Sequence, residues 1–225
     1  MRRLGLVAAL VIVALLVASG YTVSAGAAVY RDLDSGRQAL VAAQASMTAA
    51  ARTGDQAALQ GVAAQLKVAE QHFNDARQRS DTDPMLGLAG RVPGADRQLQ
   101  ASTHLAAIGA DMSRAGEGAA AVAIQVAGLK QKYAGRPLTA DDLQVALQEA
   151  QAIARTYSAS IQAISQELGA AHTERAQVDT SRLVGPLKDG YDAVDGALAE
   201  ADTSFRRYQD VRQVLSDFLG VQLPA

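Results

Sequence analysis

The sequence predicts an all-α protein: an N-terminal transmembrane helix followed by an elongated antiparallel bundle of about five helices with heptad-type packing. Apolar or small residues recur at alternating steps of three and four along most of the chain, which places them on one stripe of a helix. Aromatic residues make up 4% of the chain, and alanine dominates its apolar residues. This composition suits helices that approach one another closely.

The N-terminal segment carries a membrane signal. After Arg2 and Arg3 no charged residue occurs before Arg31, and Leu4–Val17 is almost wholly aliphatic. The uncharged stretch exceeds the ~20 residues that a bilayer-spanning helix needs. We therefore expect residues 4–29 to contact the membrane.

Residues 1–30 form the first unit, a cytoplasmic basic start plus a transmembrane anchor. A cleavable signal peptide is the alternative, because Ala25-Gly26-Ala27 has the form of a small-x-small cleavage site. The length of the uncharged stretch favours the uncleaved anchor. In either case the two arginines keep the N-terminus in the cytoplasm and the bulk of the chain outside it.

Residues 31–80 read as a helical hairpin. Thr53-Gly54-Asp55 lies between two stripes and supplies a helix-ending glycine and a helix-capping aspartate. The two helices should therefore fold back on each other. The first stripe comprises Leu33, Gly36, Leu40, Ala43, Met47 and Ala50, and the second comprises Leu59, Val62, Leu66, Ala69, Phe73 and Ala76.

Residues 81–94 read as a Pro/Gly loop. Two prolines and three glycines exclude a continuous helix across this segment. Its apolar residues indicate a loop that packs over the end of the bundle. The breakers are Pro84, Gly87, Gly90, Pro93 and Gly94, and the apolar residues are Met85, Leu86, Leu88 and Val92.

Residues 95–225 should supply three long antiparallel helices of the same bundle. Gly135-Arg136-Pro137 ends the first, Thr139 and Asp142 form a capping box for the second, and Gly185-Pro186 precedes the third. The stripes are Leu105, Ile108, Met112, Ala115, Ala119, Val122, Val126, Leu129 and Tyr133; then Leu143, Leu147, Ala150, Ala154, Tyr157, Ile161, Ile164, Leu168 and Ala171; then Leu187, Tyr191, Val194, Leu198, Ala201, Phe205 and Tyr208, continuing less regularly through Val211, Leu215 and Phe218.

Composition excludes several classes of site. The chain has no cysteine, which rules out disulfides, thiolate metal sites and cysteine nucleophiles. Its net charge of −2 and scattered basic residues give no reason to expect nucleic acid. We expect no cofactor.

No catalytic, cofactor-binding or metal-ligating residue is predicted. His72, His104 and His172 lie beside the stripes and lack a partner at the spacing of a helical zinc site. Asp81 and Asp83 lack the calcium-loop pattern and fit a capped turn better.

Three further features also read as structural. Gly116-Glu117-Gly118 and the glycines of the loop at 81–94 lack the strand or the lysine that a phosphate-binding loop requires. The four stripe tyrosines fit core packing. Arg206-Arg207 is too short to be a membrane or nucleic-acid patch.

The anchor, the Ala-rich hairpin with its Gly-Asp turn, the Arg91-Val92-Pro93-Gly94 loop before "RQLQASTHLAAIGADMSRAGEG", and the closing "VLSDFLG" resemble a bacterial membrane family. This is domain-of-unknown-function family 4012, common in actinobacteria. The resemblance covers the anchor and helical region and implies a cell-envelope location. Family members usually continue into a further domain with Gln-Asn and Gly-Gly signatures, which no residue here matches.

The sequence therefore predicts a non-enzymatic, single-pass cell-membrane protein with an extracytoplasmic helical stalk or interaction scaffold. We expect a protein partner or self-association through the bundle. One alternative is a sensor or ligand-binding ectodomain of the chemoreceptor-like helical-bundle type, although no second apolar run of about 20 residues follows the bundle. A third is a truncated part of a larger envelope enzyme.

Overall fold

A computed structural model describes residues 2–91, 94–133, 139–183 and 185–209, without the side chains of 2–24, 140, 182 and 207–209. Every regular element in these residues is helical, which confirms the all-α prediction. The elements are α1 (Arg2–Thr53), α2 (Gln56–Thr82), α3 (Pro84–Ala89), α4 (Ala95–Tyr133), α5 (Ala140–Thr156), α6 (Ser158–Ala176), the 3-10 turn η1 (Thr180–Arg182) and α7 (Gly185–Gln209).

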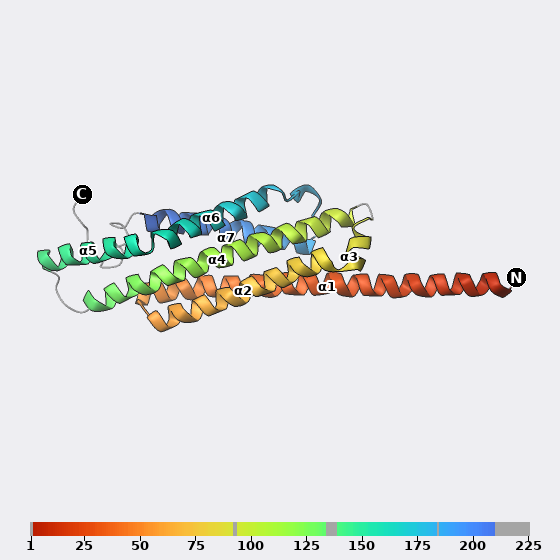
Figure 1. Ribbon diagram of the computed structural model, residues 1–225, viewed down its shortest axis with the longest axis horizontal. Helices are drawn as coiled ribbons and strands as arrows, with labels where there is room; N and C mark the ends of the chain where they lie inside the picture. Colours follow the sequence, from red (N-terminus) through yellow and green to blue (C-terminus); the bar gives the residue numbers. More distant parts are fainter. Residues whose placement is uncertain (1, 92–93, 134–138, 184, 210–225) are drawn as a thin grey trace.

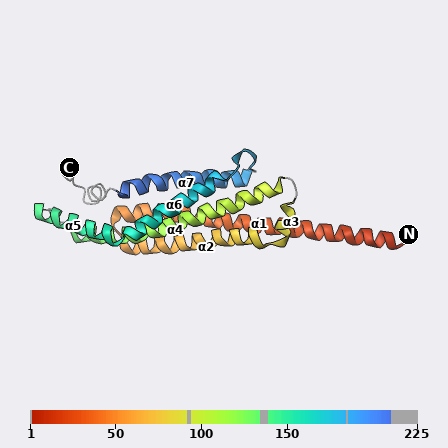
Figure 2. The same cartoon turned by 45° about the horizontal axis from the view of Figure 1, so that its top comes forward.

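Helix α4 lies at the centre of an elongated bundle and packs against α1, α2, α6 and α7. Helices α1, α4 and α7 run in one direction, whereas α2 and the α5–α6 pair return, as the alternating stripes predict (Figure 1). In the turned view, α7 and α2 lie on opposite sides of the bundle (Figure 2). Each long helix thus packs antiparallel to the next long helix in sequence.

Helix α1 joins the predicted membrane segment to the bundle without a break, since it is one helix of 52 residues. Its first part extends beyond the end of the bundle (Figure 1). Ala25 and Val29 make the first described core contacts, against the end that α3 covers. Most of the predicted anchor, residues 4–29, falls outside the described side chains. Among the described residues, no helix is long and apolar enough to cross a membrane.

The predicted turn between the first two helices is confirmed. Gly54 has a φ of +73°, a left-handed conformation that suits glycine, and it ends α1. The Asp55 side chain accepts a hydrogen bond from the Ala58 amide at 3.0 Å and caps α2. From the far end of α4, Gln131 donates to the Gly54 carbonyl at 3.0 Å and Lys130 donates to the Arg52 carbonyl. These bonds satisfy carbonyl groups that the end of α1 leaves without a helical partner.

The segment 81–94 is not the loop that its composition predicts, because it contains the short helix α3. Asp83 ends α2 and caps α3, accepting from the amides of Met85 and Leu86 at 2.9 and 3.3 Å. Leu86 is buried at the end of the bundle, as expected, but Leu88 is 53% exposed. Proline is compatible with the first turn of a helix, so Pro84 starts α3 rather than preventing it.

The fourth predicted helix is divided at Tyr157 into α5 and α6, so the bundle has more helices than the expected five. Thr139 and Asp142 form the predicted capping box at the start of α5. From 151 to 163 no side chain is buried. Because packing does not hold this stretch against α4, the axis can change direction there. The predicted stop at 135–137 lies outside the described residues.

Most buried side chains lie on the predicted stripes, but the fourth stripe is wrong around the α5–α6 break: Ala154, Tyr157 and Ile161 are not buried, because packing does not hold this stretch against α4. All six residues of the second stripe are buried, and α4 is also buried beside its stripe because it has neighbours on several sides. In α7, Val194 and Leu198 are buried, while Tyr208 and the positions after it lie outside the described side chains. The main core comprises Leu40, Ala43, Val62, Leu66, Ala69, Phe73, Leu105, Ile108, Ala110, Met112, Ala115, Ile164, Leu168, Ala171, Val194 and Leu198.

At several helix contacts, a large side chain of one helix packs against a glycine of the next, which has no side chain in the way. The Phe73 ring of α2 is 1% exposed and lies against Gly36 of α1 and Gly109 of α4. A Cβ atom on Gly36 would come within 2.9 Å of this ring, and one on Gly109 within 2.5 Å. The ring therefore occupies space that any larger residue at either position would need.

Replacing Gly109 by alanine should destabilise the bundle by about 1–3 kcal/mol, the usual cost of overpacking a tight core. The Phe73 ring cannot retreat from the new methyl group, because Gly36 lies close to it as well. The measurement is urea unfolding of the full chain in mild detergent, followed by circular dichroism at 222 nm.

Gly61→Ala is the matched control, because a Cβ there meets nothing within 4 Å on the exposed face of α2. It should stabilise the protein by about 0.5–1 kcal/mol through helix propensity. Equal effects of the two substitutions would contradict the proposed packing around Phe73.

Candidate functional site

Three charged residues interrupt the small and apolar face of α4. Asp111, Arg114 and Glu117 follow one another at intervals of three, and no other charged residue occurs between His104 and Leu129. This spacing keeps the three side chains on neighbouring positions of one helix surface. Together with their partners they form a charged seam where α2, α4 and α6 meet.

Arg114 is the centre of this charged seam. Its Nε atom donates to Glu167 Oε2 of α6 at 2.9 Å, and its Nη1 atom donates to Glu70 Oε1 of α2 at 3.2 Å. Its Nη2 atom contacts Asp111 one turn earlier on α4. One guanidinium thus bonds three carboxylates from three helices, which a planar group with five donors can do.

The carboxylates of the seam outnumber its cations, and burial acts on them. Burial raises the pKa of Asp111 to about 6; Arg114 opposes the shift, whereas Glu167 and Glu174 add to it. Burial also raises the pKa of Glu117, and Glu70 adds to that shift. The buried Oε1 atom of Glu117 has no hydrogen-bond partner among the described residues. The seam therefore favours protonation near its centre.

Two of the histidines form pairs that sequence spacing does not reveal. His104 Nδ1 of α4 lies 2.6 Å from Glu174 Oε2 of α6, and His172 Nε2 of α6 lies 2.8 Å from Asp202 Oδ2 of α7. The partners are 70 and 30 residues apart in the sequence. The histidines do lie at the bundle edge, as predicted, and these two link neighbouring helices there.

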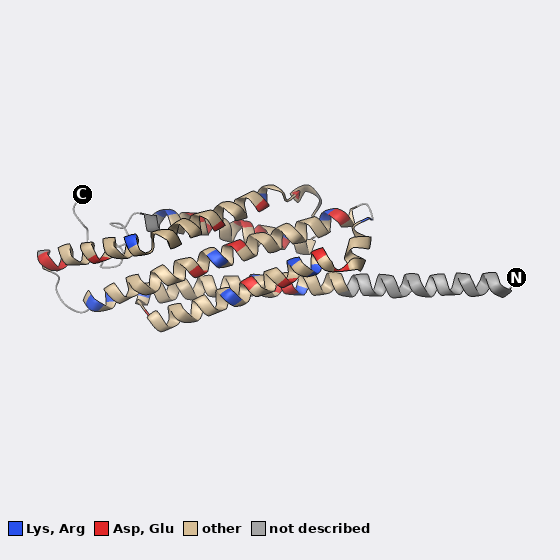
Figure 3. Ribbon diagram, viewed as in Figure 1, with Lys and Arg blue, Asp and Glu red and all other residues tan. Residues whose placement is uncertain are grey.

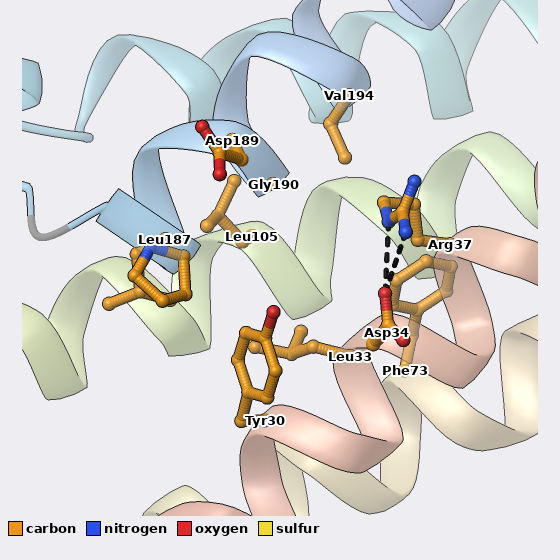
Figure 4. Close-up of a pocket in the computed structure, with 11 residues that line it drawn as sticks. Tyr30, Leu33, Asp34, Arg37, Phe73, Leu105, Leu187, Asp189, Gly190 and Val194 are labelled. Atoms are coloured by element: carbon orange, nitrogen blue, oxygen red, sulfur yellow. Dashed lines mark hydrogen bonds and ion pairs between the residues drawn. The ribbon is translucent and has the colours of Figure 1, made fainter.

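A cavity of about 210 Å3 lies where the start of α7 meets α1 and α4. In the close-up, α1 forms one wall and the first turns of α7 form the opposite wall (Figure 4). Leu105 of α4 and Phe73 of α2 contribute to the apolar lining. The lining residues are Tyr30, Leu33, Asp34, Arg37, Phe73, Leu105, Pro186, Leu187, Asp189, Gly190 and Val194.

The polar side chains of the cavity differ in how they are paired. Arg37 Nη2 donates to Asp34 Oδ1 at 2.7 Å, and Gln38 donates to the other carboxylate oxygen at 2.7 Å. The hydrogen bond from Arg37 holds the pKa of Asp34 below its usual value. Among the described residues, Asp189 and the Tyr30 hydroxyl have no ion pair or hydrogen bond that would occupy them.

Other features singled out in the sequence have structural roles. Gly116 and Gly118 pack against Leu66 and Ile164, so this segment is a close helix contact rather than a phosphate-binding turn. Asp83 caps α3, and Asp81 pairs with Arg77 at 3.9 Å on an exposed surface.

The tyrosines and the basic pair singled out in the sequence differ in burial. Tyr133 is buried and Tyr191 packs against the core, whereas Tyr157 marks the break between α5 and α6. Arg206 is exposed, and its neighbour Arg207 lies outside the described side chains. Among the described residues, no group of three or more His, Asp or Glu is placed to hold a metal ion.

No family model matches the chain, and neither the curated proteins nor the solved structures include a significant match. The resemblance to family 4012 therefore stays a prediction. No matched protein therefore assigns a role to the charged seam or to the cavity.

The sequence predicts neither the charged seam nor the cavity, because both bring together residues that are far apart in the chain. The seam had a local signal, the Asp-x-x-Arg-x-x-Glu pattern at 111–117 inside an otherwise uncharged stretch of α4. Its partners Glu70 and Glu167 are 44 and 53 residues away from Arg114. No local pattern indicates the cavity, because its walls come from four helices.

Because the pKa of Asp111 is raised in the folded protein, we expect the free energy of unfolding to fall as the pH rises. Its folded-state value of about 6 lies above the ordinary 3.8, so between these values the folded protein binds more protons than the unfolded chain. The protonated Asp111 contributes its full stabilisation below pH 3.8, and this contribution is lost as the pH rises to about 6. Relative to Asp111→Asn, the natural protein should lose on the order of 2 kcal/mol of unfolding free energy between about pH 4 and pH 7.

Chemical unfolding at a series of pH values measures this difference. Asp34→Asn is the control of opposite sign, because the pKa of Asp34 lies below 3.8 and its stabilisation is lost as pH falls through that lowered value. A natural-minus-variant difference for Asp111 that stays flat across this range would contradict the described environment.

Proposed function

We propose that this chain is a non-enzymatic, single-pass cell-envelope protein of the family 4012 type. Residues 4–29 anchor it in the membrane, and the helical bundle outside the cytoplasm acts as a stalk or protein-interaction scaffold. One observation carries the proposal: α1 is a single helix from Arg2 to Thr53. The uncharged segment before Arg31 and the first helix of the bundle are therefore parts of one rod.

The length and charge of this rod support the anchoring role. From Leu4 to Tyr30 it has 27 uncharged residues, and at about 1.5 Å per residue they exceed the ~30 Å thickness of the hydrocarbon core. Arg2 and Arg3 mark the cytoplasmic side by the positive-inside rule. Without them, 19 of the 21 basic residues and all 23 acidic ones remain outside, so the exported part has a net charge of −4.

The helix directions fit a spacer that holds its far end away from the bilayer. Since α1, α4 and α7 all run away from the N-terminus, Gln209 lies at the opposite end of the bundle (Figure 1). A partner engaged there would be held at a distance of several helical turns from the membrane.

The surface of the α1–α2 hairpin supports a role in protein contacts. From Gln38 to Leu66 the chain has only two charged residues, Arg52 and Asp55, and this half of the hairpin carries few charges on the ribbon (Figure 3). Val41 lies in this stretch and is 48% exposed. Low charge and exposed apolar side chains are typical of surfaces that contact other proteins.

A second candidate function is a sensor or ligand-binding ectodomain. The cavity between α1, α4 and α7 favours it, because scaffolds do not require a cavity lined by both apolar and charged side chains. It lies at the same end of the bundle as the anchor, where Tyr30 and Leu33 of α1 contribute to it.

A fusion of alkaline phosphatase after Ala225 tests the topology in bacteria, because this enzyme is active only after export. The complete chain should give an active, membrane-bound fusion, and the same fusion beginning at residue 31 should be inactive and cytoplasmic.

Two measurements complete the test. A fusion to green fluorescent protein, which fluoresces in the cytoplasm, should stay dark with the complete chain. The mass of the exported protein distinguishes an intact anchor from cleavage after Ala27. A fluorescent fusion with the complete chain would end the proposal.

A further inference from the structure

We propose that the cavity between α1, α4 and α7 binds a small organic ammonium ion with an apolar body. This inference does not depend on where the protein resides. It rests on three properties of the cavity: its volume, its apolar lining and its unbalanced negative charge.

The volume limits the size of the ligand. The cavity measures about 210 Å3. Cavities of about 150 Å3 accept benzene, so this one suits an apolar body of one ring with a short chain. A membrane lipid with its acyl chains is far too large.

The lining specifies an apolar body. Five aliphatic or aromatic side chains from four helices face the cavity: Leu33, Phe73, Leu105, Leu187 and Val194. Phe73 is held rigidly between glycines, so this part of the lining is formed before any ligand enters. A preformed apolar lining favours binding because little side-chain order is lost.

The charge specifies a cation. Asp34 is neutralised by Arg37 and also accepts a hydrogen bond from Gln38, so this pair contributes little net charge. Asp189 remains as a carboxylate without a described partner on the opposite wall. The Tyr30 hydroxyl points into the cavity from α1 (Figure 4). An ammonium group can donate to Asp189 while its apolar body lies against Leu105.

Gly190 supplies a direct way to close the cavity. It lines the cavity from α7, and a Cβ atom added there meets nothing within 4 Å. A Cβ atom at this position therefore displaces no neighbour, and we expect the rest of a leucine side chain to take up cavity volume. Gly196, on the same helix, is exposed, has equally open space and does not line the cavity.

The test uses isothermal titration calorimetry of the full chain in detergent with phenethylamine, and detergent alone as the blank. The ligand has nine non-hydrogen atoms, so a dissociation constant on the order of 0.1–1 mM is expected from usual ligand efficiencies. Phenylacetate, which has a similar body and the opposite charge, should bind at least about tenfold more weakly. Asp189→Asn should weaken binding of the amine about tenfold and leave that of phenylacetate no weaker.

Gly190→Leu should abolish saturable binding while the melting temperature of the free protein stays the same or rises. Gly196→Leu should bind the amine as the natural protein does. The proposal is overturned if phenethylamine shows no saturable binding, if amine and carboxylate bind equally, or if Gly190→Leu binds as well as Gly196→Leu. These outcomes are independent of the topology fusions.

Discussion

The close approach of three helices around the Phe73 ring is the constraint on which the bundle depends. The ring projects from α2 and occupies space that Gly36 of α1 and Gly109 of α4 leave open. Leu66 fits against Gly116, and Ile164 of α6 fits against Gly118, in the same manner. With only 4% aromatic residues, the protein gains dense packing by placing large side chains against bare backbone.

This packing explains why Asp111 and Arg114 of α4 are paired, although the buried Oε1 atom of Glu117 has no partner among the described residues. Asp111 is buried on this central helix and needs a partner there, which the partly exposed Arg114 supplies from the next turn. Arg114 also bonds Glu70 and Glu167 from the flanking helices. Partly exposed ion pairs of this kind contribute little net stability, so we expect their main effect on the register of α2 and α6 along α4.

The cavity lies at the start of α7, where the helices pack less closely than at the contact between Phe73 and Gly109. Among its described residues, α7 buries only Val194 and Leu198, and its first turns line the cavity together with α1. The two proposed roles are compatible in this architecture, because the proposed anchor continues into the rod of α1 and the proposed ligand site lies where α1 enters the bundle.

The long helices, the hairpin turn at Gly54, the capping box at Thr139 and most of the buried stripes are predictable from the sequence, because helix period and capping depend on residues close in the chain. The start of α3 at Pro84, the break between α5 and α6 at Tyr157 and the pairing of charges depend on contacts between helices. Residues 44 to 70 positions apart form the seam and the histidine pair between α4 and α6. Their proximity depends on how each helix is rotated and shifted against its neighbours, which no local pattern specifies.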